Sequence, residues 1–72
     1  MIEIFKTNVK NKRLADKVLR ILHSNLPGYS FNFDLEDCDR ILRAQSRGIT
    51  IETARIIRMA KDCCIEICVF ED

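Results

Sequence analysis

The spacing of apolar residues changes repeatedly along the chain, and this constrains what so short a chain can fold into. Some segments alternate apolar and polar residues, which is typical of strands with one solvent-exposed face. Others repeat an apolar residue every three or four positions, which indicates amphipathic helices. The pattern predicts strands over residues 1–8, 29–35, 40–44 and 64–70, and helices over 12–25 and 51–61.

This element order predicts an α+β, ferredoxin-like βαββαβ sandwich, with a four-stranded antiparallel sheet and two helices on one face. Right-handed crossovers place the first and third strands in the centre and the other two at the edges. A chain of 72 residues has room for one core, so residues 1–72 are expected to form a single domain. The connections near 8–13, 36–39 and 61–64 should meet at one end of the sheet, where a site is expected.

The sequence also indicates where the helices begin and end. Asn8 or Asn11 can cap the first helix, and Thr50 can cap the second. Leu26-Pro27-Gly28 should end the first helix, because proline cannot continue the hydrogen-bond ladder and glycine accepts a positive φ.

Charge and composition exclude several classes of function. The formal net charge is +1, so no field of one sign draws the chain to nucleic acid or to a membrane surface. The predicted third strand, residues 40–44, lacks the aromatic side chains on which RNA bases stack. The sequence shows neither a secretory signal nor an apolar run of membrane-spanning length. A cytoplasmic location is therefore expected, with the four cysteines reduced rather than paired in disulfides.

Three segments carry a resemblance to a known family: Leu14–Leu22, then Leu26-Pro27-Gly28, then Phe33–Glu36. With these segments in this order, nearly the whole chain resembles the heavy-metal-associated domains of copper chaperones and metal-pumping ATPases. The resemblance implies the ferredoxin-like fold predicted above. It also implies a metal-binding Met-x-Cys-x-x-Cys loop before the first helix.

The residues at the positions of that motif cannot bind the family's metal. The methionine position falls on Val9, and the two cysteine positions fall on Asn11 and Leu14. A side-chain amide and a branched hydrocarbon cannot replace thiolates as ligands for a soft ion such as Cu(I). The resemblance therefore implies the family's fold without its usual activity.

The register of the first strand remains open. Ile2 and Ile4 would share one buried face if local alternation decides the register. The family register instead turns Phe5, Thr7 and Val9 inward, and only a bulge would reconcile the two.

The cysteines offer a second, relocated metal site. Cys38 lies at the predicted hairpin tip, and Cys63 and Cys64 lie where the second helix turns into the last strand. Cys38 with Cys63 and a carboxylate, with Cys64 as a further ligand, would suit Zn²⁺ or Cu. No C-x₂-C pair is present, however, and free cysteines often serve as small apolar residues. No cofactor is therefore expected.

Catalysis is not expected either. Neighbouring carboxylates and a helix C-terminus disfavour a thiolate nucleophile at Cys38 or Cys63. The single histidine, His23, lies at the far end of the first helix and cannot act as their base. It is interpreted as a solvated helix-end residue.

Basic residues gather at the start of the first helix. Lys10, Lys12 and Arg13, followed by Lys17 and Arg20, could attract an acidic partner or a phosphate. The alternative is that the acidic hairpin, residues 36–39, neutralises them internally, and this interpretation is favoured.

These observations favour a non-enzymatic binding or interaction module. It would dock a protein partner, or a second copy of itself as a homodimer, through the loop end or through the uncovered sheet face. The first alternative is a metal-handling protein that uses Cys38, Cys63 and Cys64. A further alternative is a small-molecule sensor like the amino-acid-binding regulatory domains, which share this topology.

Overall fold

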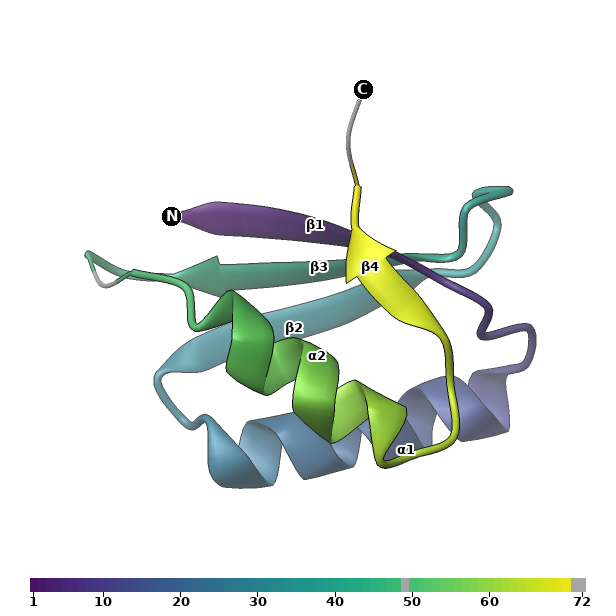
Figure 1. The fold of residues 1–72 in the computed structure, drawn as a ribbon, viewed down its shortest axis with the longest axis horizontal. Helices are drawn as coiled ribbons and strands as arrows, with labels where there is room; N and C mark the ends of the chain where they lie inside the picture. Colours follow the sequence, from purple (N-terminus) through teal and green to yellow (C-terminus); the bar gives the residue numbers. More distant parts are fainter. Residues whose placement is uncertain (49, 71–72) are drawn as a thin grey trace.

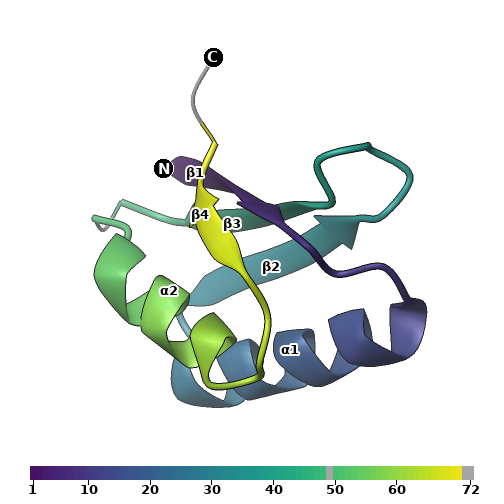
Figure 2. The ribbon, with the colours of Figure 1, turned by 45° about the vertical axis from the view of Figure 1, so that its right-hand side comes forward.

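A computed structural model describes residues 1–48 and 50–70 of the chain. Four antiparallel strands form one sheet in the order β2-β3-β1-β4, and both helices cover the same face (Figures 1 and 2). The ferredoxin-like prediction is confirmed, including the central positions of β1 and β3. The elements are β1 (Ile2–Thr7), α1 (Lys12–Asn25), β2 (Tyr29–Asp34), β3 (Ile41–Ser46), α2 (Thr53–Lys61) and β4 (Ile67–Val69).

Helix α1 begins and ends where the sequence predicts. Asn11 is its N-cap, and the Asn11 Oδ1 accepts a hydrogen bond from the Leu14 N–H at 2.8 Å. At the other end the Leu26 N–H donates to the Leu22 carbonyl, and Pro27 cannot continue the helix. Gly28 is not among the positive-φ residues, contrary to expectation, whereas Gly48 has a φ of 68°.

Helix α2 starts later than predicted, and Thr50 does not cap it. The N-cap is Glu52, whose side chain makes no capping hydrogen bond. The Tyr29 hydroxyl takes over part of this role: it accepts from the Glu52 N–H at 2.9 Å and donates to the Thr50 carbonyl at 3.1 Å. Tertiary contact with β2 thus replaces local capping at this end.

Strand β1 adopts the register that the resemblance implies, and no bulge interrupts its described pairing. It pairs with β3 continuously from Ile2↔Gln45 to Phe5↔Leu42. Phe5 and Val9 are fully buried and Thr7 is 9% exposed, whereas Ile2 is 58% exposed. The core therefore contains the aromatic side chain of β1, and Ile2 lies on the face without helices. The core side chains that are completely buried and largest are Phe5, Leu22, Leu42, Ile56, Val9 and Val18.

Three connections lie toward the same end of the molecule, on the right in Figure 1, with the hairpin and the α2–β4 turn in different layers. The Thr7 hydroxyl joins two of them: it donates to the Arg40 carbonyl at 2.6 Å and accepts from the Val9 N–H at 3.2 Å. Asn8 joins the third, because its Oδ1 accepts from the Glu66 N–H at 2.9 Å. Hydrogen bonds between distant residues thus fix the position of the start of α1.

Candidate functional site

Helix α1 carries three exposed cations on the side opposite its buried stripe. Arg13, Lys17 and Arg20 are spaced by four and three residues, so they lie on one face of the helix. The buried stripe of the same helix consists of Ala15, Val18 and Leu22, which pack against the core. We call Arg13, Lys17 and Arg20 the cationic face. Its position follows directly from the amphipathic pattern of the helix.

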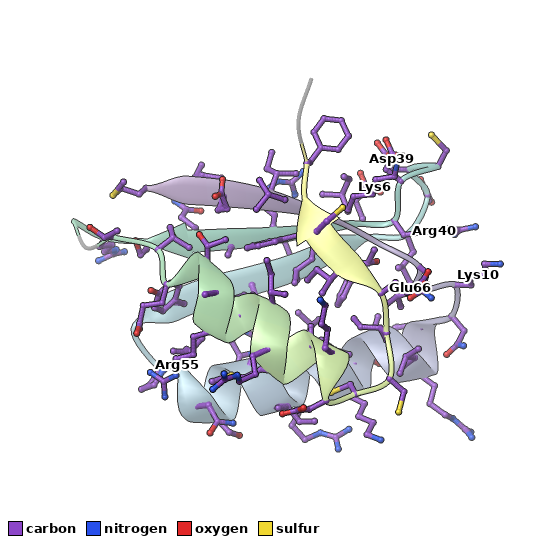
Figure 3. The ribbon with its side chains drawn as sticks, viewed as in Figure 1. Lys6, Lys10, Asp39, Arg40, Arg55 and Glu66 are labelled. Carbon is purple, nitrogen blue, oxygen red and sulfur yellow. The ribbon has the colours of Figure 1, made fainter. Side chains whose placement is uncertain are left out.

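The other predicted partner-binding residues are divided by the structure. Lys10 is exposed on the connection before α1 and points away from the molecule in Figure 3. Lys12 belongs to the other side of α1, where it lines a hollow beside β2. Of the predicted basic loop, Arg13 therefore belongs to the cationic face, Lys10 is exposed on the connection before it, and Lys12 lies on the other side of the helix.

No internal counter-charge pairs with these cations among residues 1–48 and 50–70. The ion pairs there join Lys6 to Asp39 at 3.4 Å and Arg55 to Glu52 at 3.6 Å. Among the described residues the acidic hairpin therefore makes no direct ion pair with the basic loop, although Lys12 and Glu36 line the same hollow. Asp39 lies beside Lys6 of the sheet, whereas Lys10 lies apart from both (Figure 3). The hairpin extends from the sheet layer and α1 belongs to the helix layer, so Arg13, Lys17 and Arg20 face solvent on the side of α1 away from the sheet.

A shallow, open hollow of about 520 Å³ lies along the cationic face. Its lining residues are Asn11, Arg13, Leu14, Lys17 and Arg20. The α1 N-terminus adds partial positive charge at one end, because the first N–H groups of a helix lack intrahelical acceptors. The surface is therefore complementary to acidic groups of another molecule. Its described lining residues include no nucleophile and no general base.

The positions to which the resemblance assigns a metal-binding motif lie together at the first turn of α1. Val9 is fully buried, Asn11 is exposed and Leu14 is partly buried. The hydrogen bond from the Leu14 N–H to the Asn11 Oδ1 connects the two positions where the family has cysteines. Asn11 thus has a structural function as a helix cap, and Leu14 packs against the core.

The structure does not assemble the predicted three-residue metal site. All four cysteines are free. Cys38 lies with Asp37 and Asp39, and the ligand atoms of these three residues are within 4.8 Å of one another. In the described part of the chain, no group of three such ligands includes Cys63 or Cys64. The hairpin and the α2–β4 turn are well separated in both views, because they leave different layers (Figures 1 and 2).

The Asp37–Cys38–Asp39 group is explained by the turn itself. The Asp37 Oδ1 accepts from the Asp39 N–H at 2.8 Å, and the Asp39 carboxylate pairs with Lys6. Cys64 differs from prediction: it has a φ of 63° in the turn after α2, since β4 begins only at Ile67. The turn and the ion pair with Lys6 thus account for the arrangement of the carboxylates beside Cys38.

His23 makes a contact that the sequence interpretation missed. Its Nε2 accepts from the backbone N–H of Phe31 at 3.4 Å, and the two rings lie 5.5 Å apart. The side chain is exposed, as predicted, but it also covers part of the edge of β2. No local sequence signal reveals this contact, because it depends on how α1 packs against the sheet.

The sheet face without helices carries a small apolar patch. Ile2 and Met1 are exposed, Ile4 and Phe70 are partly buried, and the exposed Cys68 lies nearby on β4. Charged side chains interrupt the patch: Arg43 is the cross-strand partner of Ile4, and Lys6 that of Cys68. The face is therefore a weaker candidate than the cationic face.

Comparison with protein-family models found no matching family, and comparison with curated proteins found no matching protein. The resemblance to heavy-metal-associated domains thus stays a prediction. Among the described residues, no helix has the length and apolar character needed to cross a membrane.

Proposed function

We propose that this chain is a non-enzymatic cytoplasmic interaction module that docks an acidic protein segment on the cationic face of α1. The observation that carries the proposal is the exposure of Arg13, Lys17 and Arg20 without a described carboxylate within ion-pair distance. Complementary charge favours encounter and orientation between two proteins. An acidic segment would supply the direct ion pairs that Arg13, Lys17 and Arg20 do not make with the described residues.

The dimensions of the cationic face favour a protein segment as its ligand. From Arg13 to Arg20 the helix rises about 10 Å, which matches two turns of an acidic helix or a short acidic strand. A nucleic acid generally requires a longer basic surface or stacking aromatic residues. Membrane insertion requires large apolar side chains on the exposed helix face. Leu14 is the one apolar residue that lines this hollow, and it is partly buried.

The resemblance to copper chaperones supports a binding module of this fold that lacks the metal bound by the chaperones. The fold and the position of the first turn of α1 are those that the resemblance implies. Asn11 and Leu14 stand where the thiolates would be, and Asn11 is engaged in capping. We therefore propose a scaffold that carries a docking surface on α1 and has no resident metal cofactor.

A charge-reversal experiment tests the proposal. Fragments of the source proteome, displayed on yeast, are selected for binding to the purified chain and then measured against two triple variants. The test variant reverses the cationic face: Arg13→Glu, Lys17→Glu and Arg20→Glu. The control reverses three exposed cations on α2 by the same total charge: Arg55→Glu, Arg58→Glu and Lys61→Glu.

We expect the enriched fragments to be acidic, to bind the wild type and the α2 control, and to bind the α1 variant at least about tenfold more weakly. Their affinity should fall with added salt, since exposed charges are screened. Binding that both variants weaken equally would show a general charge effect and refute the site. Enrichment of neutral or basic fragments that bind all three proteins would refute it as well.

A further inference from the structure

The outer edge of β2 is protected along only part of its length. β2 is the terminal strand of the sheet on its side, so one edge pairs with no described strand. The Tyr29 N–H donates to the Leu26 carbonyl at 3.2 Å, and the Phe31 N–H donates to the His23 Nε2 at 3.4 Å. Both N–H groups therefore face away from β3, and the end of α1 covers them.

The remainder of this edge is open. Alternate residues of an antiparallel strand present their N–H and C=O groups to the same side. The N–H and C=O groups of Phe33 therefore point away from β3, as those of Tyr29 and Phe31 do. No hydrogen bond among the described residues reaches the outward backbone groups of Phe33. The strand contains neither the proline nor the lysine that commonly protects exposed edges. β2 thus has a protected first half and an open second half.

A hollow of about 610 Å³ lies at this open half. It is lined by Ala15 and Leu19 of α1, by the segment 32–36, and by Lys12, Asp16 and Arg43. Leu19, Phe33 and Leu35 are partly buried hydrophobic residues packed against the core, and they give the hollow an apolar floor. The hollow includes residues from both faces of β2, so it follows the edge of the strand. An edge strand beside a helix, with an apolar hollow between them, suits an added peptide strand.

The charges around the hollow favour a basic occupant. Asp16, Asp34 and Glu36 outnumber Lys12 and Arg43, and the Arg43 side chain also donates to the Asn32 Oδ1 at 3.0 Å. A second copy paired through the same open half would bring Asp34 and Glu36 of both chains around one axis. Like charges placed opposite each other oppose that arrangement. Charge complementarity therefore selects a partner segment of the opposite sign over self-association.

We propose that the open half of β2 binds an extended peptide segment of alternating apolar and basic residues, added to the sheet as a fifth strand. Its backbone bonds to Phe33, one apolar side chain enters the hollow over Leu19, and a lysine or arginine faces Asp34 and Glu36. This site is separate from the cationic face, which lies on the solvent side of α1 and carries the opposite charge. The two proposals can therefore fail independently.

Peptide selection with matched variants tests this site. Random peptides displayed on phage are selected on the purified chain, and enriched peptides are measured against Leu19→Lys, Asp34→Lys and the control Ser30→Lys. Ser30 is exposed on the same strand, at its protected half. We expect apolar–basic alternation in the enriched peptides. Binding should be unchanged in the control and about tenfold weaker in the other two, since Lys places like charge at the apolar hollow and the acidic rim.

Failure to enrich such peptides, or enriched peptides that bind Leu19→Lys and Asp34→Lys as tightly as the wild type, would overturn the proposal. Amide hydrogen exchange gives a second test that does not depend on any variant. In the free protein the Phe33 amide should exchange faster than the Phe31 amide, and a selected peptide should slow it. A Phe33 amide already protected in dilute free protein would contradict the open edge. Protection that grows with protein concentration alone would assign the edge to a second copy and overturn the peptide occupant.

Discussion

Thr7 is the residue whose replacement most sharply tests how the loop end is built. Its hydroxyl donates to the Arg40 carbonyl at 2.6 Å and accepts from the Val9 N–H at 3.2 Å, and the residue is 9% exposed. Valine has nearly the same shape but no hydroxyl. Thr7→Val therefore removes both hydrogen bonds and leaves a buried N–H and a partly buried carbonyl without a protein partner.

The expected cost follows from these two groups. Each buried polar group left unsatisfied costs about 1–3 kcal/mol, with the lower part of that range applying to the carbonyl that water can reach. The additional methyl group of valine returns about 1 kcal/mol through apolar burial. We therefore expect Thr7→Val to lower the free energy of unfolding by about 2 kcal/mol. That is a substantial part of the roughly 4–11 kcal/mol expected for a domain of this size.

Urea unfolding measures this change, with the same dependence of the free energy of unfolding on urea concentration (m-value) expected for each protein. Thr7→Ser is the matched control. Serine keeps the hydroxyl and loses one methyl group, which should cost about 1 kcal/mol. Amide exchange separates the two variants further, since the Val9 amide should lose protection in Thr7→Val and keep it in Thr7→Ser. A Thr7→Val protein as stable as the wild type, with a protected Val9 amide, would refute the assigned bonding.

Three further predictions concern the core, the helix cap and the cysteines. Leu22→Ala should destabilise the protein by about 2–5 kcal/mol in urea unfolding, because Leu22 is fully buried, and a loss below about 1 kcal/mol would contradict its place in the core. Asn11→Ala should lower the free energy of unfolding by about 0.5–2 kcal/mol. Asn11→Asp should lower it much less, because aspartate can also accept from the Leu14 N–H. Equal losses in the two variants would argue against the cap. Zinc titration by calorimetry should show no stoichiometric, tight binding to the reduced protein. One tightly bound ion that disappears in Cys38→Ser would instead support the metal-handling alternative.

The architecture was predictable because short-range patterns determine it. The stripe formed by Val18 and Leu22, the end at Leu26-Pro27 and the alternation through Phe31 each indicate one element. Handedness and strand order then follow from general rules of chain topology. The register of β1 was harder to predict, because the alternation fits burial of Ile2 and Ile4 as well as burial of Phe5 and Thr7. It is decided only by which set the rest of the core can bury.

The candidate sites were predictable only in part, because they depend on distances between layers. The sequence indicates that basic residues gather at the start of the first helix, but the predicted surface was the loop Lys10, Lys12 and Arg13 rather than one helix face. It does not indicate that Arg13, Lys17 and Arg20 make no ion pair with the acidic hairpin among the described residues. The contact of His23 with Phe31 has the same origin, since both depend on how α1 packs under the sheet.

The most direct test of the central claim is an NMR titration of the ¹⁵N-labelled protein with an acidic fragment from the display selection. We predict that the amide signals of residues 10–20, which include the cationic face, shift and saturate, and that the signals of β4 and the uncovered sheet face stay unchanged. Saturating shifts centred instead on Ile2, Ile4 and Phe70 would show that the partner docks on the uncovered sheet face, and would contradict the account.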